Sequence, residues 1–203
     1  MLLVSRSEAA YHHGNLVPAI ERAALELMRS QGHASLSLRE VARQAGVSHN
    51  APYHHFGDRS ALLKRLSERS MAELLGALQT AEQQAEESGI DAGSEHAYAT
   101  AIGVAYVGYA ADHPERFRLI YDPKVCIPGA PSAAMEPLLH SVEEILATAT
   151  AALIPGGEPA AVATLATGVW GAVHGLAELV VAGHISRAEV PLALEALLGV
   201  RGK

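Results

Sequence analysis

Apolar residues recur at intervals of three and four along most of the chain. Leu16, Ile20, Ala23 and Leu27, for example, lie on one face of a helix of 3.6 residues per turn. No long alternating run rich in Val, Ile or Thr competes with this periodicity, and glycine or proline separates one periodic segment from the next. The pattern predicts an all-α fold of about nine helices and no strands.

The predicted helices span residues 15–31, 37–46, 48–56, 58–88, 94–112, 113–121, 133–153, 159–183 and 187–198. Three of them have recognisable first residues. Ser37 and Glu40 form a capping-box pattern, and Ser48 and Asp58 are residues that cap helix N-termini. Pro52 lies one turn into the short third helix, where it would remove that helix's first backbone bond to Ser48.

The net charge of −7 is unevenly distributed. Residues 1–80 contain nine Lys and Arg against seven Asp and Glu, whereas residues 81–203 contain six against fifteen. This asymmetry favours nucleic-acid contact by the first part of the chain. The single cysteine, Cys126, excludes an internal disulfide and a cysteine-rich zinc site. Together with the absence of a secretory leader, it predicts a cytoplasmic protein.

One uncharged stretch, residues 160–177, is long enough for a minimal membrane span. It is rich in Ala, Gly and Thr, includes His174 and is followed directly by Glu178. This composition favours a buried helix at an oligomer interface, so we expect no membrane association.

Residues 36–63 predict a helix-turn-helix. Gly46 allows the left-handed backbone of a sharp turn, and Val41, Ala42 and Val47 are small enough for two helices to cross closely. The second helix would then project its first polar residues into a major groove. By spacing alone, an exposed polar helix of another helical protein remains an alternative. The adjacent His54 and His55 face different directions on a helix and do not predict a metal site.

The same segment resembles the DNA-binding domain of TetR-family transcriptional regulators. The positions that match the family pattern are Val47, Ser48, Tyr53, His55, Phe56, Arg59 and Leu62. Residues 11–16 (YHHGNL) and 170–176 (WGAVHGL) also resemble one branch of the family, which has a WHG-type C-terminal domain. The resemblance implies a mobile arm at 1–14, a three-helix DNA-binding domain at 15–60, and a helical effector-binding and dimerisation domain at 61–203.

Carried over position by position, the resemblance implies a set of DNA contacts. His49, Asn50 and Ala51 would face base edges, Arg39 would reach a base or a phosphate, and Ser48 would belong to the same DNA-binding set. Phosphates would be held by Tyr53, His54 and Arg59. Phe56 would pack inside. His54 departs from the Arg or large aromatic residue found in relatives, so a permanent cation is missing there.

In the family, the second domain dimerises and binds a small effector, so residues 133–153 and 159–183 would form a four-helix interface with a second copy; the alternative is that these helices pack within the core of a single chain. Aromatic and polar residues at helical spacing are candidates for an effector pocket; the alternative is that they form ordinary core. These candidates are Tyr98, Ile102, Tyr106, Tyr109, Phe117, Tyr121, Trp170, His174 and Glu178.

The function implied is that of a bacterial, nucleoid-associated homodimeric repressor. It would bind a pseudo-palindromic double-stranded operator, and an unidentified small-molecule effector would release it. The alternatives are a constitutive DNA-binding regulator without an effector and a helical-bundle enzyme or small-molecule carrier. Because the sequence has no metal-ligand spacing, phosphate-binding glycine loop or nucleophile elbow, we expect no catalytic residue, metal or cofactor.

Overall fold

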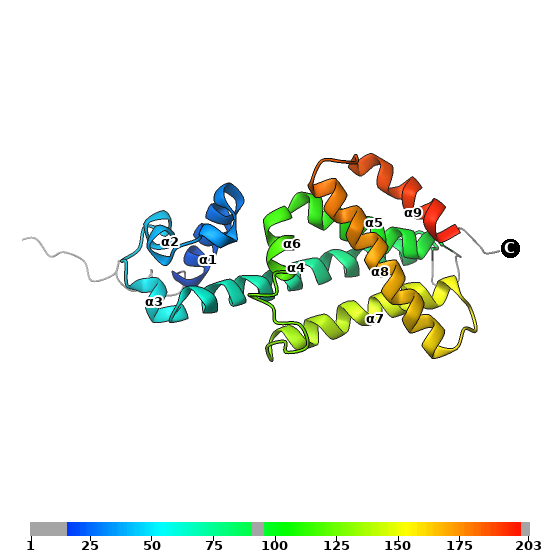
Figure 1. Ribbon diagram of the computed structural model, residues 1–203, viewed down its shortest axis with the longest axis horizontal. Helices are drawn as coiled ribbons and strands as arrows, with labels where there is room; N and C mark the ends of the chain where they lie inside the picture. Colours follow the sequence, from blue (N-terminus) through cyan, green and yellow to red (C-terminus); the bar gives the residue numbers. More distant parts are fainter. Residues whose placement is uncertain (1–15, 91–95, 200–203) are drawn as a thin grey trace, which may run out of the picture.

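The computed structural model describes residues 16–90 and 96–199, which form a small lobe and a larger lobe (Figure 1). These ranges contain nine α-helices and no strand, which confirms the predicted all-α fold. The predicted arm, residues 1–14, lies outside the described residues. The helices are α1 (Leu16–Gln31), α2 (Leu38–Ala45), α3 (Ala51–Phe56), α4 (Arg59–Glu87), α5 (Ala97–Asp112), α6 (Pro114–Ile120), α7 (Met135–Leu153), α8 (Pro159–Val181) and α9 (Val190–Gly199). Two short 3₁₀ helices, η1 (His33–Ser35) and η2 (Arg187–Glu189), precede α2 and α9.

Helix α4 runs from the small lobe into the larger one (Figure 1). Its first turn is capped by Asp58, whose carboxylate accepts a bond of 2.8 Å from the backbone N–H of Ala61. Leu62, Leu63 and Leu66 belong to the apolar core of the small lobe. From Met71 onward, the buried residues of α4 belong to the core of the larger lobe. One helix therefore contributes to both cores.

The turn between α2 and α3 has the predicted backbone. Gly46 lies in the left-handed region with φ 68°, and the side chain of Ser37 caps α2 by accepting a bond from the backbone N–H of Glu40. The prediction that Ser48 caps α3 is wrong, because α3 begins only at Ala51 and its N-cap residue, Asn50, makes no side-chain capping bond. Pro52 consequently lies in the first turn of α3, where its missing N–H removes no helical bond.

Helix α6 joins the two lobes. Leu119 is fully buried in the small-lobe core, whereas Phe117 is fully buried in the large-lobe core. Immediately after α6, Asp122 bonds with Nε2 of His33 in η1 over 2.8 Å. The pKa of Asp122 is lowered, first by the backbone N–H of Lys124 and then by the bond with His33.

Ion pairs also cross the junction. Glu21 of α1 is 4% exposed and contacts Arg65 and Arg69 of α4 at 3.2 and 2.8 Å. Glu73, also on α4, pairs with Arg69 and with Arg116 of α6. Because a buried carboxylate needs charged partners, the pairs of Glu21 with Arg65 and Arg69 fix the first half of α4 against α1.

Helix α8 lies across the larger lobe (Figure 1), and few of its residues are buried. Among the described residues it is the one helix that is long and apolar enough to span a membrane, and only 17% of its most apolar window is buried. Val173 and Ala177 are its buried residues. A single copy of the chain therefore exposes an apolar helix face.

Candidate nucleic-acid interface and aromatic cluster

The outer end of the small lobe carries the side chains predicted to contact DNA. Residues 48–50 and the following Tyr53 and His54 are all exposed, with Tyr53 at 49%. They are held in place by the opposite face of α3, since Ala51 and Pro52 are buried and Phe56 packs against the small-lobe core. The short helix is therefore anchored by its apolar residues and presents polar ones.

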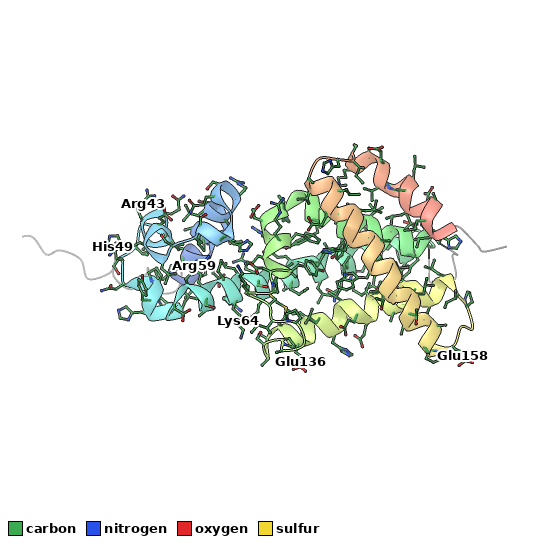
Figure 2. All side chains as sticks on the ribbon, viewed as in Figure 1. Arg43, His49, Arg59, Lys64, Glu136 and Glu158 are labelled. Carbon is green, nitrogen blue, oxygen red and sulfur yellow. The ribbon has the colours of Figure 1, made fainter. Side chains whose placement is uncertain are left out.

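Arg39 is exposed on α2, as predicted, and the structure adds Arg43 to the same surface. Arg43 is exposed one helical turn after Arg39 and lies beside His49 at the outer end of the lobe (Figure 2). Its position four residues after Arg39 was a signal available in the sequence. These two guanidinium groups supply fixed positive charge at a surface where His54 replaces the usual cation.

Ala51 does not lie on this surface. It is 8% exposed and belongs to the small-lobe core, so its methyl group has no path to a thymine in this conformation. The expectation that it meets a base edge is therefore corrected. The reason is that Ala51 and Pro52 form the apolar side of α3, which packs against the small-lobe core.

Arg59 also has partners that the sequence did not indicate. Its Nε donates to the carbonyl of Leu36 at 2.7 Å, and its Nη2 donates to the carbonyls of His33 and Ala34 at 2.7 and 2.9 Å. The guanidinium thus closes the 3₁₀ turn between α1 and α2, inside the lobe (Figure 2). In this conformation the Nε and Nη2 groups of Arg59 position the α1–α2 connection.

The structure brings together five of the nine predicted effector residues, on α6, α5 and α8. The ring of Tyr121 lies 5.1 Å from that of Phe117 and 4.6 Å from that of His174, centre to centre. The hydroxyl of Tyr106 bonds with that of Tyr121 at 2.7 Å and with Nδ1 of His174 at 3.0 Å. The ring of Trp170 lies 6.1 Å from that of His174. We call Tyr106, Phe117, Tyr121, Trp170 and His174 the aromatic cluster.

Burial dominates the electrostatics of this cluster. It raises the pKa values of Tyr106 and Tyr121, because the tyrosinate form would lose its hydration. It lowers the pKa of His174, with the nearby Glu178 partly opposing that effect. At neutral pH, the cluster therefore contains an uncharged imidazole and two uncharged phenols, which can serve as hydrogen-bonding groups within an apolar wall.

The other four predicted effector residues do not join the cluster, although Glu178 lies near it. Tyr98 donates to the carboxylate of Glu82, and Tyr109 donates to the carbonyl of Ser70 at 2.8 Å. Ile102 is core, and Glu178 is exposed. Tyr109 also lines a groove of about 540 Å³ between α4 and α5. Among the described residues, no group of three or more His, Cys, Asp or Glu side chains is arranged to hold a metal ion.

Comparisons with known proteins match both parts of the chain. Residues 20–66 match the family model described as bacterial regulatory proteins, tetR family, and residues 99–199 match the model described as tetracyclin repressor-like, C-terminal domain. Comparison with curated protein sequences finds no match.

Solved structures similar to this chain cover nearly its whole length. A protein of unknown function from Rhodococcus sp. RHA1 is 32% identical, with a TM-score of 0.75 and 95% of this chain and 96% of that one covered. A TetR-like transcriptional regulator from the same organism is 19% identical, with a TM-score of 0.67 over 93% of this chain and 97% of that one. A regulatory protein in the tetR family from Rhodococcus RHA1 is 19% identical, with a TM-score of 0.67 over 92% and 97%.

Proposed function

The chain belongs to the TetR family of bacterial transcriptional regulators, and we propose that it acts as a homodimeric repressor that a small molecule releases from its operator. The family consists of DNA-binding regulators and not of enzymes, so the helical-bundle enzyme is set aside. The proposal includes a cytoplasmic location on the nucleoid, a WHG-type second domain, and the division into residues 1–14, 15–60 and 61–203. The proposed division is supported by the two separate apolar cores, since the buried residues of α4 up to Leu66 belong to one core and those from Met71 onward to the other.

The observation that carries the proposal is the polar outer end of the small lobe. Asn50 can pair with an adenine edge, with Ser48 and His49 beside it. Tyr53, His54 and Arg39 would contact phosphates, joined by Arg43. All seven residues are exposed, five of them on or just before α3 and the two arginines on α2 of the helix-turn-helix. A structural role for Arg59 replaces the phosphate contact that the resemblance implied.

The exposed face of α8 supports a two-fold dimer. Thr164, Gly168, Gly171 and Gly175 recur along it at helical spacing, and each is exposed. A Cβ added at any of the three glycines would meet no neighbour within 4 Å, so the face is open to a second chain. Packing α8 and α7 against their copies would cover this apolar surface. The operator would then be a pseudo-palindrome with half-site centres about 10 bp apart or a multiple of that.

The effector response would begin at the aromatic cluster. Phe117 and Tyr121 lie on or next to α6, whose Leu119 and following Asp122 contact the small lobe. A ligand that displaced these rings would move α6, and α4 would tilt with it as a lever. Release follows only if the ligand favours a dimer in which the two α3 helices no longer match successive major grooves.

Footprinting of the purified full chain on DNA flanking its own gene tests the proposal. We expect protection of one pseudo-palindrome, and sedimentation of the free protein as a dimer at micromolar concentration. A monomer that protects no DNA contradicts the proposal. A dimer that protects DNA and keeps it in the presence of every metabolite tried supports the constitutive regulator instead.

A further inference from the structure

The second helix of the helix-turn-helix has histidines where a permanent cation would be expected. Residues 44–58 contain three histidines, one aspartate and neither Lys nor Arg. The three histidines, His49, His54 and His55, are all exposed on or just before α3. The charge of this part of the proposed DNA-binding surface therefore depends on how many of the imidazoles carry a second proton.

We propose that the binding of double-stranded DNA by this chain is coupled to proton uptake by His54, so that affinity rises as the pH falls from 8 to 6. This inference rests on the proposed function, because it takes His54 as a residue that lies against a phosphate. It adds a second regulator, the proton, whose site is on the DNA-binding surface itself.

His54 can approach a phosphate without a change in the fold. Its side chain is exposed, while the buried Ala51 and Pro52 lie on the inner side of the same short helix. The other cation expected at a phosphate, Arg59, uses its Nε and Nη2 groups for backbone carbonyls within residues 33–36. His54 is thus the residue proposed at a phosphate on α3 that can become a cation.

Helices α2 and α4 pack against α3 and determine the charges around it. The titratable groups on α2, on the small-lobe part of α4, and on or beside α3 are Arg39, Glu40, Arg43, His49, Tyr53, His55, Asp58, Arg59, Lys64 and Arg65. The two carboxylates have other partners: Glu40 accepts from the hydroxyl of Ser37, and Asp58 accepts from the backbone N–H of Ala61. The negative charge that would hold a proton on His54 therefore arrives with the DNA.

The sign of the effect follows from the charge of the phosphate. The pKa of an ordinary imidazole is about 6.5, and an anion within about 4–6 Å favours the imidazolium form. A histidine whose pKa is higher in the complex contributes affinity that is fully present below its free-state pKa and is lost as the pH rises through its pKa in the complex. A rise of about one pH unit would increase affinity about 6-fold between pH 8 and pH 6 for one histidine, and about 30-fold for the two copies of a dimer.

The test uses the purified full chain and two duplexes of equal length, one from DNA flanking its own gene and one of random sequence. Gel-shift titrations at pH 6, 7 and 8 measure affinity, and calorimetry at pH 7 in phosphate and Tris buffers measures proton uptake. We expect affinity for the flanking duplex to rise about 30-fold from pH 8 to pH 6, with uptake of about half a proton per chain at pH 7. Binding should also depend more steeply on salt at pH 6 than at pH 8, because one more cation meets a phosphate.

Three substitutions separate His54 from other titrating groups. His54→Gln keeps a polar side chain that cannot titrate, so it should remove both the rise in affinity and the proton uptake. His54→Arg supplies a permanent cation and should bind more tightly than the parent chain at pH 8, without the pH dependence. His184→Gln is the matched control: it replaces an exposed histidine between α8 and η2 and should keep the full pH dependence. Circular dichroism checks that each variant is folded.

The outcomes distinguish this inference from the proposed function. Specific binding of the flanking duplex with equal affinity at pH 6 and pH 8, or full pH dependence in His54→Gln or His54→Arg, overturns this inference and leaves the proposed function intact. Equal affinity for both duplexes, with a pH dependence that His54→Gln removes, supports this inference and contradicts only the proposed function. A chain that binds neither duplex at any of these pH values overturns both.

Discussion

The outer faces of α3 and α8 are both exposed, yet they differ in chemistry. On and before α3, the exposed residues are Ser, His, Asn and Tyr, and the apolar Ala51 and Pro52 point inward. On α8 the exposed residues include three glycines, together with Trp170 at 44% and Leu179 at 42% exposure. Helix α3 has six residues and α8 has twenty-three, so the larger unpartnered surface is the apolar one.

This difference indicates two kinds of partner. A polar face beside two arginines can exchange its water for the phosphates and base edges of DNA. Covering an apolar face with another apolar surface lowers the free energy of the system. The small residues of α8 allow a second helix to approach closely. These two faces are what the proposed dimeric DNA-binding regulator would require, namely a surface for a polyanion at one end of the chain and a surface for a second copy at the other.

Placing a charge on the α8 face should have the largest effect. Gly171→Glu puts a carboxylate where the proposed partner helix packs, and burying it there without a counter-charge would prevent association. Since a monomer can hold only one half-site, we expect operator affinity to fall about 100-fold or more. Analytical ultracentrifugation and gel-shift titration measure the two effects.

Gly76→Glu on α4 is the matched control. Gly76 is also inside a helix, and a Cβ added there would likewise meet nothing within 4 Å. Both substitutions replace a glycine by a better helix former, so neither should unfold the chain. If Gly171→Glu remains a dimer with full operator affinity, the interface does not include this face of α8.

The second prediction concerns Arg59, whose structural role separates it from the exposed arginines. Arg59→Ala removes the charged donor from three backbone carbonyls, so we expect the free energy of unfolding to fall by about 2–3 kcal/mol. Urea unfolding followed by circular dichroism measures this change. DNA affinity should fall as a consequence of the disturbed α1–α2 connection.

Arg39→Ala provides the contrast. This side chain is exposed, so stability should change by less than about 0.5 kcal/mol while operator affinity and its salt dependence both decrease. If Arg59→Ala is as stable as the parent chain and its DNA binding depends less on salt, the phosphate contact predicted from the sequence for Arg59 is supported instead.

These contrasts also separate what the sequence could predict from what it could not. The helices follow from apolar spacing and from local signals such as Ser37, Gly46 and Asp58, which act within a few residues. The start of α3 was misplaced because Ser48 and Asn50 are both good capping residues, and only the burial of Ala51 distinguishes between them.

Contacts between distant segments account for the remaining differences. The carbonyls that engage Arg59 belong to residues 33–36, and their orientation depends on the 3₁₀ turn. Tyr98, Tyr106 and Tyr109 are on one predicted helix, yet Tyr98 and Tyr109 bond to α4 whereas Tyr106 bonds to Tyr121 after α6, and spacing within α5 could not reveal those partners. The bond between His33 and Asp122 joins residues 89 positions apart and left no local signal.

A third prediction separates base contacts from phosphate contacts on the polar face. Asn50→Ala should reduce discrimination at one base pair of the half-site by about 1–2 kcal/mol, because a side-chain amide that pairs with a base edge is lost. Competition titrations with single-base operator variants measure this effect. Asn50→Ala should also cause a small loss of affinity for every operator sequence.

Tyr53→Phe is the paired variant. It removes one hydroxyl from an exposed residue and should weaken binding to every sequence by a similar amount, about 1 kcal/mol or less. If Asn50→Ala leaves the base preference unchanged, another residue contacts that base edge, and His49 is the next residue to substitute.

The smallest effect is expected at the junction between the two lobes, where Asp122 follows α6. Its pKa is lowered in the folded chain, chiefly by the backbone N–H of Lys124 and then by His33. The ionised carboxylate therefore favours the folded state at pH values above about 4, and this contribution disappears as the pH falls through the folded-state pKa. Asp122→Asn should lower the free energy of unfolding by about 0.5–1 kcal/mol at pH 6 and by progressively less toward pH 3.

Urea unfolding is measured with and without Asp122→Asn in a His33→Gln background, so that titration of the imidazole does not enter the difference. A cost that stays constant from pH 6 to pH 3 would show that the side chain acts there by shape and hydrogen bonding alone.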